Sequence, residues 1–76
     1  MKYSYKIKLS ETAHAVDFVR SAGKCDFDID VFYNRVIIDA KSILGVLSLD
    51  LTKVLTVRCQ GRDREFEEIL EKYCAV

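Results

Sequence analysis

The sequence has no excess of either charge and no long hydrophobic run. Its 76 residues contain 12 Lys and Arg against 12 Asp and Glu, so no overall field attracts nucleic acid or an anionic membrane. No apolar stretch reaches the length of a membrane span, and the first ten residues alternate polar and apolar instead of forming a signal peptide. We therefore expect a cytoplasmic protein without nucleic-acid or membrane partners.

Cysteine is scarce and unpaired in the sequence. Cys25, Cys59 and Cys74 are odd in number, far apart and outside any C-x-x-C pair, which indicates neither a disulfide framework nor a zinc site. We expect them to be small core hydrophobes in a reducing compartment. No other grouping of residues indicates a metal site or a cofactor.

Changes in the period of apolar residues divide the chain into seven predicted elements. A period of two predicts strands, and apolar residues three or four apart predict helices. In order, the sequence predicts a strand at 3–9, a helix at 10–23, strands at 26–33 and 36–40, a short helix at 42–47, a strand at 55–59 and a helix from 63 to 73. Four strands with one apolar face and two longer amphipathic helices are typical of an α+β domain in two layers, with helices on one face of an antiparallel sheet.

The sequence also predicts local features at the turn between two strands and in the last helix. A two-residue turn at Asn34 and Arg35 places the apolar residues of both strands on one face, but a type I′ turn strains Arg35, which lacks the freedom of glycine. In the last helix, Asp63 is a good first residue, and charged residues four apart predict two ion pairs on the exposed face. These pairs are Arg64 with Glu68 and Glu68 with Lys72.

The most distinctive segment is KSILGVLSL, residues 41–49. It resembles Lys-Ser-Ile-Met-Gly-Val-Met-Ser-Leu, the signature of the HPr family, the histidine-containing phosphocarrier proteins of the bacterial sugar phosphotransferase system. SAGKCDFDIDVFYNRVIIDA (21–40), TVRCQGRD (56–63) and the last helix extend the similarity over nearly the whole chain. The resemblance implies one HPr-like domain over residues 1–76, which acts as a carrier or kinase substrate and not as an enzyme.

The first helix departs from the family pattern. Family members open this helix with Gly-x-His-Ala-Arg-Pro-Ala, where the histidine carries the phosphoryl group. Counting without gaps, Glu11 holds the histidine position, Ala13 the arginine position and His14 the proline position. Glu11 either complements the helix dipole or mimics a phosphate, and the resemblance implies no working phosphohistidine at this place.

His14 is the single histidine, so any phosphohistidine in this chain must use it. It matches the family's His-Ala pair only if the preceding loop gains three residues and the helix loses about one turn. Otherwise His14 is an exposed histidine of the first turn.

The segment around Ser42 keeps the family pattern. Ser42 is either only the N-cap of the short helix or, as the resemblance implies, a site for an ATP-dependent HPr-type serine kinase. Ile43, Leu44 and Leu47 cannot all face the sheet from a helix of barely two turns, and the family exposes their equivalents as a docking patch. Val46 and Leu49 are the better candidates for the core.

The sequence therefore leads to a preferred hypothesis and two alternatives. The preferred one is a regulatory or docking protein without phosphohistidine, which binds phosphotransferase-system proteins or a catabolite-repression regulator and is switched at Ser42. The catabolite-repression HPr-like protein is a precedent by resemblance. The first alternative is an active carrier that uses His14, and the second is an HPr fold reused for an unrelated binding role.

Overall fold

The computed structural model describes residues 3–75 and contains four strands and three helices in the predicted β-α-β-β-α-β-α order. The predicted fold class is confirmed. The elements are β1 (Tyr3–Ile7), α1 (Thr12–Gly23), β2 (Ile29–Tyr33), β3 (Val36–Asp39), α2 (Ile43–Leu47), β4 (Leu55–Cys59) and α3 (Arg64–Lys72).

The four strands form one antiparallel sheet in the order β1-β4-β2-β3. The β2–β3 hairpin has the predicted register, in which Tyr33 lies opposite Val36 and Val31 opposite Ile38. The predicted strain at Arg35 was wrong, because only Asn34 in this turn has a positive φ, at 54°. Asparagine tolerates the left-handed region better than most residues, so the turn forms without glycine.

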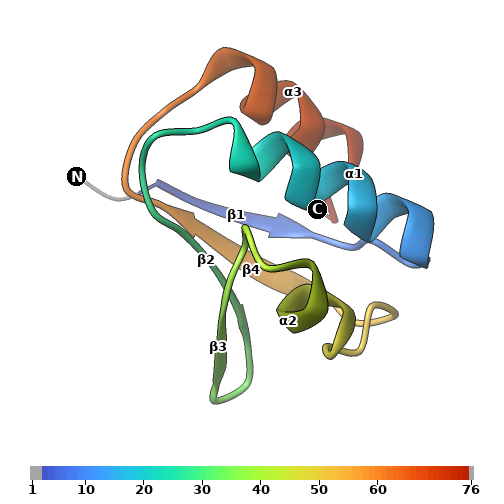
Figure 1. Cartoon of the computed structure of the whole chain (residues 1–76). Coiled ribbons are helices and arrows are strands. Elements are labelled where there is room, and N and C mark those ends of the chain that lie inside the picture. Colours follow the sequence, from blue (N-terminus) through green and yellow to red (C-terminus); the bar gives the residue numbers. More distant parts are fainter. Residues whose placement is uncertain (1–2, 76) are drawn as a thin grey trace.

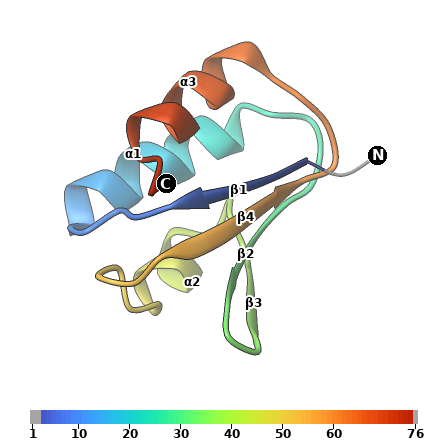
Figure 2. The same ribbon diagram turned by 180° about the vertical axis from the view of Figure 1, so that it is seen from behind.

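α1 and α3 lie side by side over one face of the sheet, and α2 packs against α1 and β3 (Figures 1 and 2). Their apolar stripes meet the inward residues of the strands, and the rings of Phe18 and Phe66 pack with centroids 5.7 Å apart. The predicted core residues Val46 and Leu49 are buried. The other large buried side chains of this core are Ile7, Leu9, Ile29, Val31, Leu55, Val57 and Leu70.

The helix ends follow the backbone and not the apolar period alone. Ser10 was predicted to begin the first helix, but its φ of 70° is incompatible with a helix, and α1 begins at Thr12. At α3 the prediction is confirmed, since the side chain of Asp63 accepts a hydrogen bond from the N–H of Phe66 at 2.9 Å.

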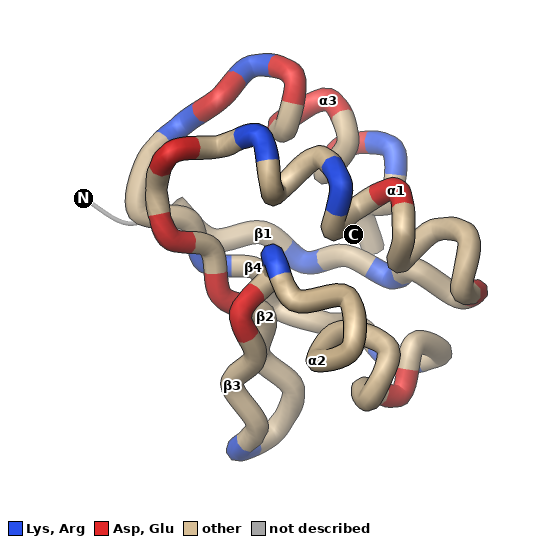
Figure 3. Tube along the Cα trace, viewed as in Figure 1, with Lys and Arg blue, Asp and Glu red and all other residues tan. Residues whose placement is uncertain are grey.

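Basic and acidic residues are interspersed along α1 and α3 (Figure 3). Neither of the two ion pairs predicted within α3 forms in residues 3–75, and Lys72 lies 3.4 Å from Asp17 of α1 instead of pairing with Glu68. A contact between helices has replaced the one expected within a helix. None of the helices in residues 3–75 is long and apolar enough to cross a membrane.

The three cysteines do not share one environment. Cys25 and Cys59 are buried, and burial raises the pKa of Cys25 and raises that of Cys59 to about 11. Both thiols therefore stay protonated at neutral pH, as expected of core residues. The same prediction was wrong for Cys74, which is exposed after the end of α3, where the chain forms an isolated bridge with Ile7.

Replacing Phe18 by alanine tests the contact between α1 and α3. We expect the Phe18→Ala change to lower the free energy of unfolding by about 3–5 kcal/mol, because a fully buried ring leaves a cavity that the core cannot close. Urea denaturation followed by circular dichroism measures this loss. Val16→Ala on the same helix is the control, and its 36% exposed side chain predicts a change below about 1 kcal/mol. Equal losses for both variants would contradict the assigned packing.

Candidate functional site

The amino end of α1 presents free backbone donors beside a carboxylate. Glu11 is the N-cap residue, with an extended backbone (φ −144°, ψ 164°), and its side chain makes no capping hydrogen bond. Within residues 3–75, the N–H groups of Thr12 and Ala13 donate no hydrogen bond. The negative charge of Glu11 thus stands near the positive end of the helix dipole, where it is favourable.

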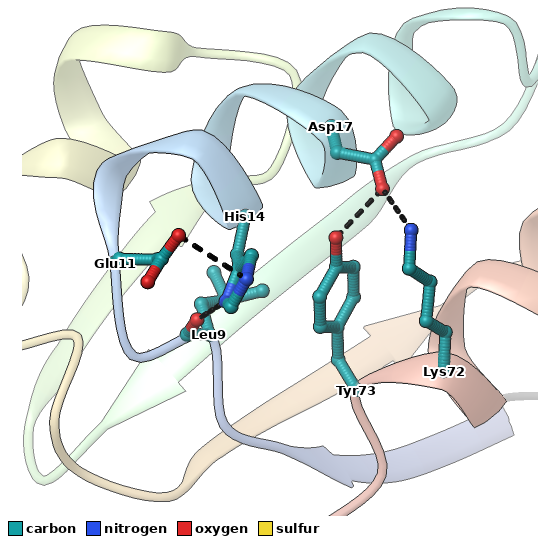
Figure 4. Close-up of polar contacts among 6 residues, drawn as sticks. All are labelled: Leu9, Glu11, His14, Asp17, Lys72 and Tyr73. Atoms are coloured by element: carbon teal, nitrogen blue, oxygen red, sulfur yellow. Dashed lines mark hydrogen bonds and ion pairs between the residues drawn. The ribbon is translucent and has the colours of Figure 1, made fainter.

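His14 lies in the first turn of α1 and is held on both sides of its ring (Figure 4). Its backbone N–H donates to the carbonyl of Glu11 at 3.1 Å. In the side chain, Nδ1 bonds to the carbonyl oxygen of Leu9, and Nε2 lies 3.6 Å from a carboxylate oxygen of Glu11. The ring also packs against Tyr73 of the α3 end, with centroids 5.0 Å apart. Both nitrogens of the single histidine therefore face oxygen atoms of the protein.

The contact between α1 and the end of α3 contains a polar cluster that the sequence did not predict. The hydroxyl of Tyr73 donates to Asp17 Oδ2 at 2.7 Å, and Lys72 Nζ donates to the same oxygen at 3.4 Å (Figure 4). The Tyr73 hydrogen bond, followed by that of Lys72, holds the pKa of Asp17 below its ordinary value. Burial, followed by the bond to Asp17, raises the pKa of Tyr73. Only the helical spacing of Asp17 from His14 signalled that both residues share one side of α1.

A shallow hollow of about 590 Å³ opens beside His14. Lys8, Lys72 and His14 contribute its basic groups, and Tyr73 forms part of its wall. The side chain of His14 is 35% exposed here. The hollow is therefore the place where solvent or a partner protein reaches the ring.

Ser42 is the N-cap residue of α2, as predicted. Its backbone is extended and its hydroxyl oxygen accepts a hydrogen bond from the N–H of Gly45 at 3.1 Å. A Cβ on Gly45 would lie 2.7 Å from a methyl of Ile38 and 3.1 Å from the Ser42 oxygen. Glycine is therefore needed for the close approach of α2 to β3. Lys41 does not face the Ser42 hydroxyl, because its Nζ donates to the carbonyl of Cys25 at 2.8 Å.

The predicted docking patch, Ile43, Leu44 and Leu47, is exposed unevenly. Leu44 is 80% exposed and Leu47 is 37% exposed, whereas Ile43 is half-buried. Leu44 is the most exposed large apolar side chain that the structure describes. The helix that carries the patch, α2, is in contact with α1.

Comparison with known proteins gives one family and similar solved structures. Residues 4–75 match a family described as PTS HPr component phosphorylation site. The phosphocarrier protein HPr from Bacillus anthracis str. Ames is 25% identical over 96% of both chains, with a TM-score of 0.73. HPr-C-His from Thermoanaerobacter tengcongensis is 26% identical over 95% of this chain and 88% of its own, with a TM-score of 0.72. The catabolite repression protein Crh of Bacillus subtilis is 28% identical over 87% of this chain and 76% of its own, with a TM-score of 0.61.

The Asp17→Asn variant tests the polar cluster between α1 and α3. Because folding lowers the pKa of Asp17 from 3.8, the folded protein binds fewer protons there than the unfolded chain, and the carboxylate adds stability above that range. We expect a contribution of roughly 0.5–1 kcal/mol at neutral pH, which allows for a side chain that is 35% exposed. Urea unfolding across pH measures the difference between the two proteins.

The difference in the free energy of unfolding between the unchanged protein and the Asp17→Asn variant should have its full size above about pH 5. It should vanish as the pH falls through the lowered pKa of folded Asp17. Glu68→Gln is the control, because the side chain of Glu68 makes no hydrogen bond or ion pair within residues 3–75. A difference that grows on acidification contradicts the assignment.

Proposed function

This chain belongs to the HPr family of the phosphotransferase system, and we propose that it acts there as a regulatory or docking protein without phosphohistidine carrier activity. The observation that carries the proposal is the carboxylate of Glu11 at the amino end of α1, where the family resemblance implies a histidine. A carboxylate is a poor reversible carrier near neutral pH compared with an imidazole nitrogen. The partners proposed are other proteins of the system or a catabolite-repression regulator.

The surroundings of His14 also argue against carrier activity. A phosphoryl group on Nε2 would stand beside the Glu11 carboxylate, 3.6 Å away, where like charges repel. A phosphoryl group on Nδ1 would displace the hydrogen bond to the Leu9 carbonyl. Each route removes an interaction that now orients the ring and adds negative charge near Glu11.

Ser42 is the proposed switch. Its side chain is exposed and its only bond within residues 3–75 is the cap to Gly45. A phosphate there would add a charge of about −1.5 to −2 at the start of α2, directly before the proposed docking patch. Phosphorylation by an HPr-type serine kinase would therefore change the charge of the docking surface without removing a core contact.

An active carrier that uses His14 is the second candidate. The 35% exposure of its side chain, beside the lysines of the hollow, favours this function. A third possibility is a fold reused for an unrelated binding role, which involves no exchange of phosphate with the system.

Radioactive phosphate transfer distinguishes these functions. Incubation with phosphoenolpyruvate and the first enzyme of the system should leave His14 unlabelled, whereas ATP and the serine kinase should give acid-stable label on Ser42. Ser42→Ala is the matched control for the second reaction, and a known HPr protein is the positive control for both. Acid-labile label that disappears in the His14→Ala variant establishes the carrier function instead. No label from either source favours the unrelated binding role.

The docking patch is tested by the Leu44→Asp variant. Leu44 is 80% exposed, so the change should leave the fold intact while it places a charge in the centre of the proposed contact. We expect the affinity of the Ser42-phosphorylated protein for the catabolite-repression regulator to fall about tenfold or more, as measured by calorimetry.

Val54→Asp introduces the same charge at another exposed apolar residue, outside the docking patch, and serves as the control. If both variants bind like the unchanged protein, α2 is not the docking surface. A loss in both variants would show that the added charge acts nonspecifically.

A further inference from the structure

Within residues 3–75, one edge of the sheet is covered by another segment of the chain, and the other edge is open. Along β1, the chain after α3 covers the edge, through a bridge between Ile7 and Cys74 and a hydrogen bond of 3.0 Å from the N–H of Ala75 to the carbonyl of Lys6. Along β3, no segment of residues 3–75 pairs with the outer edge. Uncovered edge strands are templates for a further strand.

The free edge of β3 is apolar. Ile37 is 61% exposed and Val36 is 46% exposed, which makes them two of the most exposed large apolar side chains outside α2. The charged residues that often protect an edge are found only at the two ends of this segment, Arg35 before it and Asp39 at its last position.

The register of the hairpin determines which backbone groups are free. Val36 and Ile38 lie opposite Tyr33 and Val31, and the N–H of Ala40 donates to the carbonyl of Ile29 at 2.9 Å. Even-numbered residues of β3 therefore direct their backbone groups toward β2. By alternation, the N–H and C=O of Ile37 point to the open edge.

We propose that β3 pairs antiparallel with β3 of a second copy of this chain, about a twofold axis beside Ile37. In this register Ile37 lies opposite its own copy and exchanges two backbone hydrogen bonds with it. Val36 then lies opposite Ile38 of the second copy, and Arg35 lies opposite Asp39. The segment Arg-Val-Ile-Ile-Asp is complementary to itself when reversed, with three central apolar positions between opposite charges.

The charges at the ends are available for this contact. Arg35 is exposed and forms no hydrogen bond or ion pair within residues 3–75. Asp39 uses one carboxylate oxygen to accept the N–H of Lys41 at 2.9 Å, which leaves the other oxygen for an arginine. The carbonyl of Asp39 already accepts the N–H of Ser42, so the central pair of Ile37 residues provides the main backbone contact.

Both faces of the joined sheets gain apolar contacts. On the face opposite the helices, Ile37 stands beside Phe32, over whose ring Arg58 lies at 4.5 Å. Pairing of the two copies would place four apolar side chains in a row across this face: Phe32 and Ile37 of one copy, then Ile37 and Phe32 of the other. On the helix face, the exposed side chain of Val36 would pack against the half-buried Ile38 of the copy.

Other registers lack this complementarity. Antiparallel partners must both direct their hydrogen-bonding groups outward, so the register changes in steps of two residues. A step in either direction places Ile37 opposite Arg35 or opposite Asp39 and removes both ion pairs. Because the contact is small, the dimer should be weak and form with rising concentration.

Sedimentation equilibrium from micromolar to millimolar concentration tests the proposal. The unchanged protein should shift from monomer mass toward dimer mass, and Ile37→Lys should remain monomeric. Val54→Lys adds the same charge at an exposed apolar residue just before β4 and should dimerise like the unchanged protein. A monomer at every concentration, or a dimer that persists in the Ile37→Lys variant, overturns the proposal.

Charge exchange tests the register. Arg35→Asp should weaken association by about tenfold or more, because it places like charges opposite each other at both ends. Asp39→Arg should do the same, whereas an equimolar mixture of the R35D and D39R chains should associate at least as well as the unchanged protein. Weakening without recovery in the mixture, with both chains folded by circular dichroism, overturns this register.

Discussion

Burial of a single apolar sheet face beneath the helices is the constraint on which the rest of this small protein depends. A chain of 76 residues can bury only about 60% of the surface that its unfolded form exposes, so one core must supply nearly all the stability. Phe18 and Phe66 join the two long helices above that face. Among residues 3–75, no polar or charged residue is buried, and the hydroxyl of the buried Tyr73 bonds to Asp17. Chemistry must therefore take place on surfaces and at the ends of elements.

The amino end of α1 and the short helix α2 are the two such places on which the proposed function rests. They lie on elements that pack against each other. α2 has the serine cap, the close-packed Gly45 and the exposed Leu44, whereas α1 has Glu11 as its N-cap and, in its first turn, a histidine whose nitrogens both face protein oxygens. The proposed regulatory or docking role rests on this contrast: we propose α2 as the recognition surface, and Glu11 places a fixed charge where the family resemblance implies a histidine.

A second surface lies along β3, which also packs against α2. The residues after α3 cover the β1 edge of the sheet, and no segment of residues 3–75 pairs with the outer edge of β3. Ser42 follows closely after β3, and its N–H bonds to the carbonyl of Asp39. The proposed pairing edge and the proposed phosphorylation site are therefore joined by one turn.

The order of elements, the hairpin register and the helix caps at Ser42 and Asp63 were predictable from the sequence, because each depends on neighbours a few positions away. Tertiary structure decided what depends on distant groups. Lys72 pairs with Asp17 and not with Glu68, Cys74 is exposed while Cys25 and Cys59 are buried, and the positive φ of Ser10 delays α1 to Thr12. The same is true of His14, whose ring contacts Leu9 and Glu11 of the connection between β1 and α1, and Tyr73 at the end of α3. Sequence periodicity determines which face of an element is apolar, but only the packed fold determines which polar groups meet across it.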